Sequence, residues 1–352
     1  MEIYRNVLDL LDRGESVALL LVVATSGSVP QRIGAKALVN QQGKLLKGTI
    51  GGGLMESKAL AIGKQALQQG RTTLFEVALN ETYVSRHVGP ICGGTMQIFA
   101  MPCQPEGRDA YACAVESVQR RQRSLLLTTL IGRDAGCLRW FSAEAINDGT
   151  WPIDFSQLQS FLQNQTSGTM VESQLDGKLF VEPMVALPRM LIVGGGHVGQ
   201  AVATQAIWLG FDVTVLDDRI EFVQPDRFPA GAKVICGEIG DEVARFPKEK
   251  DSYIILVSKG HKPDAQALER CIHANSAYIG MIGSRRKTSL LKKDFLASGL
   301  ATEAEFSRVF SPIGLDLGAV TVEEIATSIM AQVIAVRRRG RTSHTTIDIK
   351  LP

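Results

Sequence analysis

The sequence has no apolar stretch that approaches the roughly 18 residues a membrane-spanning helix needs. Its first residues, MEIYRNVLDLLDRGES, lack the basic start and long apolar run of a secretory signal and instead have the spacing of an amphipathic helix. Basic and acidic side chains are nearly balanced, 38 against 36, and the basic ones are spread along the chain. We therefore expect a cytoplasmic protein that binds neither membranes nor nucleic acid.

Signs of disulfide or zinc chemistry are also lacking. Six cysteines occur, but none forms a CxxC pair and no histidine joins them at zinc spacing. A cytosolic chain of 352 residues does not need disulfide bonds, so we expect most of these thiols to be small buried apolar side chains. No Walker loop and no G-x-S-x-G motif is found.

Two patterns of secondary structure divide the chain. Residues 1–187 mix strands with a few helices: about 2–13, one with apolar positions from Leu54 to Leu67 that ends at Gly70, and about 109–121. The polar stretch 145–170 indicates a loop with one short helix. From Met190, short β-rich runs alternate with helical stretches, which predicts a parallel sheet with helices on both faces. The expected fold is an N-terminal α+β domain, 1–187, joined to a C-terminal Rossmann-like, doubly wound domain, 188–352.

The clearest local motif is the segment MLIVGGGHVGQAVATQAIWLGFDVTVLDD. Gly194, Gly196 and Gly199 form G-x-G-x-x-G between an apolar strand and a helix, which is the arrangement that a dinucleotide-binding loop requires. Asp217 ends the next strand, where a ribose-binding carboxylate belongs, although Arg219 nearby weakens the preference for a free 2′-hydroxyl. His197 inside the motif is unusual but not diagnostic. A Rossmann-type fold with another kind of ligand stays open.

Basic residues follow the fourth and fifth strands of the predicted sheet. The two segments are Ser258-Lys259-Gly260-His261 and Gly283-Ser284-Arg285-Arg286-Lys287. At the edge of the sheet where the ligand is expected, Lys259, His261 and Arg285 suit an anionic, phosphate-bearing ligand. The alternative is that these side chains are solvated residues of first helical turns.

The N-terminal domain has two glycine clusters, Gly51–Gly53 and the pair that follows Cys92. A loop cysteine beside free backbone N–H groups can have a lowered pKa and act as a soft metal ligand or sulfur acceptor. A structural role for Cys92 is the alternative. His87 lies five residues before Cys92, but two such residues do not make a metal site.

Several segments together resemble the XdhC/CoxI family of molybdenum hydroxylase accessory proteins. They occur in the family's order at both ends of the chain, and only about 104–187 lacks a matching piece. The matching segments are TSGSVPQRIGAKALV, GTIGGGLMES, ICGGTMQIF, IVGGGHVGQAVA, VTVLDDR, VSKGHKPDAQAL, YIGMIGSRRK and FSPIGLDLGAVTVEEIA.

The resemblance implies a protein that binds molybdenum cofactor (molybdopterin or its dinucleotide form), assists its sulfuration with a cysteine desulfurase and delivers it to an apo-enzyme such as xanthine dehydrogenase. The family's CGG cysteine falls on Cys92, which makes this thiol the expected metal contact. Some family members carry a further cysteine in the stretch that corresponds to Gly51–Gly53, and its absence here puts a two-thiol site in doubt.

Two other functions stay open. One is an NAD(P)-dependent oxidoreductase that uses the glycine motif and Asp217, with Cys92 or His261 as the reactive group, although no recognisable catalytic set accompanies them. The other is a sensor or scaffold that binds a nucleotide and changes partners. We expect a chaperone without turnover of its own. The oligomeric state is not fixed by the sequence, and a homodimer is one option.

Overall fold

The structure is a computed structural model that describes residues 1–78, 93–142, 153–164, 167–174 and 177–340. The chain divides into two compact units, Met1–Ala186 and Leu187–Pro352. Within the described residues, no helix is both long enough and apolar enough to cross a bilayer.

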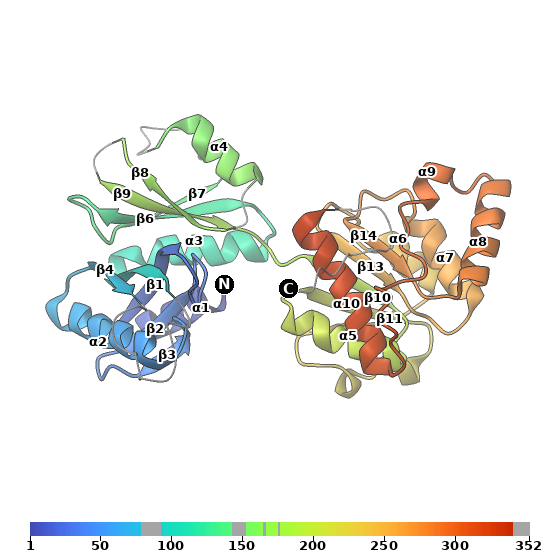
Figure 1. The fold of residues 1–352 in the computed structure, drawn as a ribbon, viewed down its shortest axis with the longest axis horizontal. Coiled ribbons are helices and arrows are strands. Elements are labelled where there is room, and N and C mark those ends of the chain that lie inside the picture. The colour runs from blue at the N-terminus through green and yellow to red at the C-terminus, as the bar shows by residue number, and fades with distance from the viewer. Residues whose placement is uncertain (79–92, 143–152, 165–166, 175–176, 341–352) are drawn as a thin grey trace. The chain divides into compact units, whose positions relative to one another are not determined.

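The first unit contains two antiparallel sheets (Figure 1). One has the order β3-β2-β1-β5-β4 and the other β7-β6-β9-β8. The strands of the first are β1 (Val17–Ser26), β2 (Lys36–Asn40), β3 (Leu45–Gly48), β4 (Thr73–Ala78) and β5 (Thr95–Pro102). The strands of the second are β6 (Ser124–Ile131), β7 (Leu138–Ser142), β8 (Thr169–Glu172) and β9 (Lys178–Met184).

Helices cover both sheets, so the first unit is built in layers. Its helices are α1 (Glu2–Asp12), α2 (Gly53–Gln69), α3 (Arg108–Gln119) and α4 (Phe155–Asn164), with a 3-10 turn at Pro105–Gly107. Alternate residues of β1 enter two cores: Leu19 and Leu21 meet α1 and α3, while Leu20 meets α2. Because both faces are covered, β1 has a continuous apolar sequence rather than alternation. The core over α1 and α3 extends to the second sheet, and α4 covers that sheet's other face.

A partly buried polar cluster joins the two sheets. Lys36 of β2 donates from Nζ to Glu182 Oε1 of β9 over 2.6 Å, and its side chain is 10% exposed against 18% for Glu182. Tyr4 of α1 donates its hydroxyl to the other carboxylate oxygen of Glu182. Burial, and then the charge of Glu182, raise the pKa of Tyr4 well above its ordinary value. The phenol therefore remains a hydrogen-bond donor, and both oxygens of the buried carboxylate have partners.

The second unit has a five-stranded parallel sheet in the order β12-β11-β10-β13-β14. This result confirms the predicted Rossmann-like class. The strands are β10 (Arg189–Val193), β11 (Asp212–Asp217), β12 (Lys233–Cys236), β13 (Ser252–Leu256) and β14 (Tyr278–Met281). The connected helices are α5 (His197–Trp208), α6 (Ile239–Arg245), α7 (His261–Cys271), α8 (Arg285–Ala297), α9 (Glu303–Phe306) and α10 (Val322–Arg339), with 3-10 turns at Ile220–Phe222 and Pro225–Arg227.

Helices pack on both faces of this sheet (Figure 1). One core contains residues of α5 and α10, and the other contains residues of α6, α7 and α8. The last helix begins where the T-x-x-E spacing predicts: Thr321 Oγ1 accepts from Glu324 N, and the Glu324 carboxylate accepts from Thr321 N over 3.0 Å. Because successive parallel strands end at the same edge, this edge gathers the segments that follow β10, β11, β13 and β14.

One element of the first unit differs from the sequence-based expectation. The stretch 145–170 predicted a loop with one short helix, which α4 supplies, but β8 also forms at its end. β8 has four residues and, among the residues that the structure describes, pairs only with β9, at the edge of its sheet. A strand this short has too few positions to display a period of two.

We predict that Glu182→Gln destabilises the first unit by about 3 kcal/mol, because it leaves the buried Lys36 ammonium without its counter-charge. Chemical denaturation, with hydrogen exchange of the β9 amides as a local reporter, measures this loss. Glu172→Gln is the matched control, since its partner Lys178 lies 3.4 Å away and the Glu172 side chain is 77% exposed. Equal effects of the two substitutions would contradict the assignment.

Candidate functional site

The glycine-rich loop leaves β10 and turns sharply into α5. Gly194 has φ +118°, and a Cβ there would lie 2.5 Å from the Val257 carbonyl oxygen. Its N–H donates to Leu216 O over 2.7 Å. Gly199 is equally constrained, because a Cβ there would lie 1.8 Å from the Gly194 carbonyl oxygen. The first and third glycines of the motif therefore allow close packing of the loop, the helix and the sheet, as the motif predicts.

The middle glycine has the opposite surroundings. Gly196 is the N-cap of α5 with φ −69°, and a Cβ there would meet no atom within 4 Å. His197, the first residue of the helix, is exposed. The loop is thus open at the point where the N-terminus of α5 faces solvent. Backbone N–H groups and the partial positive charge of a helix N-terminus favour an anionic group at such a position.

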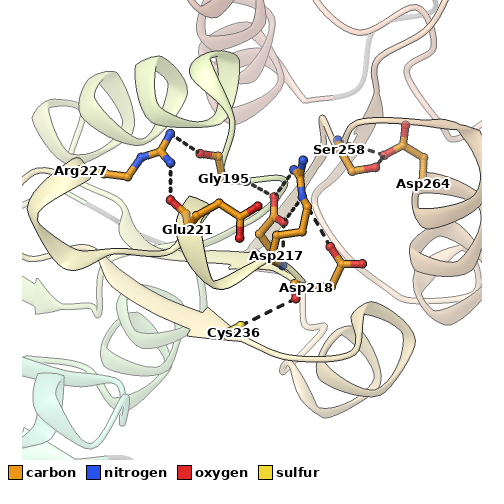
Figure 2. Close-up of polar contacts among 9 residues, drawn as sticks. Gly195, Asp217, Asp218, Glu221, Arg227, Cys236, Ser258 and Asp264 are labelled. Atoms are coloured by element: carbon orange, nitrogen blue, oxygen red, sulfur yellow. Dashed lines mark hydrogen bonds and ion pairs between the residues drawn. The ribbon is translucent and has the colours of Figure 1, made fainter.

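The carboxylate expected to bind a ribose is engaged by the protein itself (Figure 2). Asp217 is 2% exposed. Its Oδ2 accepts from Gly195 N and from Arg219 Nη2, both over 2.9 Å, and its Oδ1 accepts from Arg219 Nε over 2.9 Å and Arg219 N over 3.1 Å. Burial opposes ionisation of Asp217, but these hydrogen bonds outweigh burial and lower its pKa. Asp217 therefore fixes the loop and Arg219 together.

The segment after β11 closes over the same side of the loop. A Cβ on Gly195 would lie 2.2 Å from the Phe222 carbonyl oxygen. The guanidinium of Arg219 stacks on the Phe222 ring at 3.8 Å, and that of Arg227 lies 4.9 Å from the same ring. Figure 2 shows Arg227 directed at the carbonyl groups of Gly195 and Glu221. The ribose side of the loop is thus filled by two arginines and a phenylalanine.

A buried acid organises the loops after β13 and β14. Asp264 is fully buried, and its Oδ1 accepts from Ser258 Oγ over 2.5 Å and from Ser258 N over 3.1 Å. Its Oδ2 accepts from Lys287 Nζ over 3.4 Å, and Lys287 also donates to Gly260 O over 3.2 Å. Burial raises the pKa of Asp264, although the bonds from Ser258 and Lys287 oppose this shift. The network ties the loop after β13 to the first turn of α8.

The basic residues expected at this edge have different surroundings. Lys287 is bound by Asp264, whereas Lys259 and Arg285 are exposed. Arg285 is the first residue of α8, after its N-cap Ser284. His261 begins α7. The topology therefore brings Gly196, His197, Lys259, His261 and Arg285 to one edge of the sheet.

The proposed thiol site lies only partly within the described structure. Cys92 and His87 are outside the described residues, but the glycines that follow Cys92 are within them. A Cβ on Gly94 would lie 2.6 Å from Ser28 O, and one on Gly51 would lie 2.6 Å from Pro30 Cγ. Both glycine clusters thus pack against residues 26–31.

Glu56 stabilises this region of the first unit. Its Oε2 accepts from Thr49 Oγ1 over 2.6 Å and from Ile50 N over 2.9 Å. The Thr49 hydroxyl contributes most to the lowered pKa of Glu56. No group of three or more His, Cys, Asp or Glu side chains among the described residues could hold a metal ion.

Three residues that shape the site were not predicted from the sequence: Phe222, Arg227 and Asp264. Phe222 and Arg227 lie in short 3-10 turns that have no periodic signal. Asp264 is an acid in the first turn of a helix, a position that usually indicates a solvated interaction with the helix dipole. Only the tertiary structure reveals that it is buried.

Comparisons with known proteins identify the family of the chain. A model described as the XdhC Rossmann domain matches residues 190–333, and a model of the XdhC and CoxI family matches residues 10–78. The two matches together span more than half of the chain. The chain belongs to the XdhC and CoxI family. The resemblance deduced from the ordered motifs is thereby confirmed.

Two curated relatives of this XdhC/CoxI protein match along nearly all of its length. The uncharacterized protein YqeB of Escherichia coli (strain K12) is 25% identical over 341 residues, which are 97% of this chain and 47% of that protein. A probable xanthine dehydrogenase subunit of Bacillus subtilis (strain 168) is 25% identical over 338 residues, which are 96% of this chain and 98% of that protein. The chain therefore spans about half the length of the first relative and nearly all of the second.

A solved structure supports the fold. The crystal structure of a xanthine dehydrogenase from Bacillus halodurans has a TM-score of 0.77 and 20% sequence identity, with 96% of each chain covered. At this identity, the likeness supports the architecture of the chain and nothing further.

We predict that Asp217→Asn destabilises the second unit by about 2 kcal/mol at neutral pH, because it removes a buried acceptor of charge-assisted hydrogen bonds. The pKa of Asp217 is lower in the folded state than in the unfolded state. Its stabilisation is therefore fully present above about pH 3.9, the ordinary value, and is lost as the pH falls through the folded pKa.

Denaturation between pH 2 and 7, with hydrogen exchange of the β11 amides as a local reporter, measures the effect of Asp217→Asn. Asp218→Asn is the control, since the Asp218 side chain is 53% exposed and lies 3.7 Å from Arg219. A difference between wild type and Asp217→Asn that does not shrink in acid would disprove the assignment.

Proposed function

We propose that this protein binds molybdenum cofactor, assists its sulfuration together with a cysteine desulfurase, and delivers it to a molybdenum hydroxylase such as xanthine dehydrogenase. Membership of the XdhC and CoxI family supports the proposal. The B. subtilis relative, whose name links it to xanthine dehydrogenase, supports the choice of target. The cofactor is cargo in this proposal, and the protein acts in the cytoplasm as a chaperone without turnover of its own.

The observation that carries the proposal is the asymmetry of the glycine-rich loop. Gly196 is open to an anion, while Asp217 and Arg219 close the side on which a dinucleotide's ribose would lie. This arrangement suits a phosphorylated ligand that is not held through a ribose hydroxyl. Molybdopterin is a phosphorylated pterin and meets this requirement. The exposed residues Lys259 and Arg285 add positive charge along the same edge. His197 is exposed there as a further hydrogen-bonding group.

Cys92 has the second role in the proposal. A thiolate is a soft ligand that suits molybdenum and sulfur chemistry. Both glycine clusters of the first unit pack against residues 26–31, and Cys92 directly precedes one of them. We assign Cys92 to contact with the metal or its sulfur.

The NAD(P)-dependent oxidoreductase is the alternative. It requires Asp217 to accept from the ribose hydroxyls of the dinucleotide. Both carboxylate oxygens of Asp217 already accept two hydrogen bonds from the protein. Binding of a dinucleotide in that mode would have to break the ion pair with Arg219, which weighs against this alternative.

We predict that the purified protein retains near-stoichiometric molybdenum and pterin after incubation with molybdenum cofactor and gel filtration. Gly196→Asp lowers retention about tenfold or more, since it adds a negative charge where the phosphate lies, a difference of about 1.4 kcal/mol. Gly196→Asn is the matched neutral control. Both side chains have open space at this position and both are favourable helix N-caps.

If Gly196→Asp and Gly196→Asn retain equal amounts of molybdenum cofactor, the phosphate does not bind at Gly196. For the thiol, Cys92→Ala is compared with Cys137→Ala, another cysteine of the first unit, which is exposed. Loss of sulfuration and delivery with Cys92→Ala alone is the expected result. Unchanged delivery would refute the role of Cys92.

We predict that NADH and NADPH bind weakly or not at all, because the Arg219 pair occupies Asp217. Fluorescence titration of both nucleotides with wild-type protein and with Arg219→Ala measures this. If the wild type binds either nucleotide at low micromolar concentration and consumes it with a substrate, the oxidoreductase alternative replaces the chaperone.

A further inference from the structure

A cavity of the C-terminal unit is lined by residues outside the glycine-rich loop. It has a volume of about 960 Å³ and lies among the start of α8, residues 311–319 between α9 and α10, and the start of α10. Four hydroxyl side chains line it together with apolar ones. The hydroxyl residues are Thr288, Ser289, Ser311 and Ser328, and the apolar ones include Ile313, Leu317 and Ile325.

The wall formed by residues 311–315 is held by buried hydrogen bonds. Gln332, which is 4% exposed, accepts from Gly314 N over 3.0 Å and donates to Gly314 O over 3.2 Å. Ser328 Oγ donates to Leu315 O over 2.5 Å, and Ser311 Oγ donates to Met281 O over 3.1 Å. A Cβ on Gly314, where φ is +93°, would lie 2.4 Å from Ser328 Oγ. The cavity is thus pre-formed rather than a gap between mobile side chains.

Two opposite charges line the cavity without pairing with each other. Asp316 and Arg285 are both exposed, and neither side chain has a hydrogen-bond or ion-pair partner among the described residues. Two other acids at this edge do have ion-pair partners: Asp217 pairs with Arg219, and Asp264 pairs with Lys287. A carboxylate accepts hydrogen bonds and a guanidinium donates them, so a complementary ligand offers donors at one end and an anion at the other.

We propose that this cavity binds the 2-amino-4-oxopyrimidine edge of a heterocycle, with Asp316 as the acceptor for the ring N–H and the adjacent amino group. Pterins and guanine share this edge, and adenine lacks it. The apolar side chains contact the ring faces, and Arg285 attracts a phosphate attached to the ring system. The choice of a pterin rests on the proposed function, whereas the cavity's preference for this edge does not.

The cavity lies at the same edge of the parallel sheet as the glycine-rich loop, since Ser311 and Ile313 bond the Met281 carbonyl at the end of β14. β14 lies two strands from β10, which is about 10 Å at ordinary strand spacing. Both strands end at the same edge of the parallel sheet.

The test is binding of free ligands to the full chain, measured by calorimetry and by quenching of pterin fluorescence. The probes are 6-hydroxymethylpterin, its phosphate ester, GMP and AMP. Asp316→Asn is expected to weaken both pterins and GMP about tenfold or more, the size of one bidentate contact. Arg285→Ala is expected to weaken the phosphate ester more than the unphosphorylated pterin. Asp294→Asn and Lys293→Ala, exposed changes near the other end of α8, are the matched controls.

The outcomes separate this proposal from the function proposed above. AMP binding as tight as GMP and pterin binding, or equal pterin affinity of wild type and Asp316→Asn, overturns the cavity's role. If wild type and Asp316→Asn retain molybdenum cofactor equally, the chaperone function stands and the cavity proposal fails. If free pterins bind through Asp316 but the intact cofactor is not retained, the cavity proposal stands and the chaperone function fails. Tighter binding of GMP than of pterins identifies guanine as the recognised base.

Discussion

The close approach of α5 to the turn that precedes it is the constraint on which the second unit depends. Gly199 lies so near the Gly194 carbonyl group that no side chain fits between them. Gly194 is in turn bound to Leu216 and lies against Val257, so the loop is fixed between β11 and β13. The positions of the segments that follow these two strands, and with them Asp217 and Ser258, follow from this packing.

A dinucleotide site usually has both an opening for the phosphates and free space for the ribose. The glycine-rich loop of this protein has the first and lacks the second. The opening at Gly196 for an anion remains, while the ribose side is filled by Arg219 and Phe222. A buried carboxylate that accepts four hydrogen bonds is costly to disturb. In the function proposed above, a few residues after β11 adapt the same fold to a ligand other than a dinucleotide.

Local signals in the sequence predicted much of the fold and part of the site. Three of these signals lie in short stretches of sequence: the glycine spacing, the alternation of strands and helices after Met190, and the T-x-x-E spacing at Thr321. Each corresponds to contacts between residues that are close in the sequence. The partners of Asp217 and Asp264 were not predictable in the same way. Whether an acid is solvated, paired or fully buried depends on residues that meet only when the chain is folded, such as Lys287 beside Asp264. The cavity at Asp316 also combines segments that have no common pattern.

The last helix has a consequence for how the protein is made. α10 closes the same core as α5, where Val202 and Ala206 are clustered with Ile329 and Val333. α5 covers part of that face of the parallel sheet, but the rest stays exposed until residues beyond Thr321 have left the ribosome. The first unit, which ends at Ala186, can fold while the second is still being synthesised. A messenger RNA truncated shortly before the codons of α10 therefore yields a chain with a folded N-terminal unit and a parallel sheet whose apolar face is partly exposed. Such a chain is a substrate for chaperones and proteases.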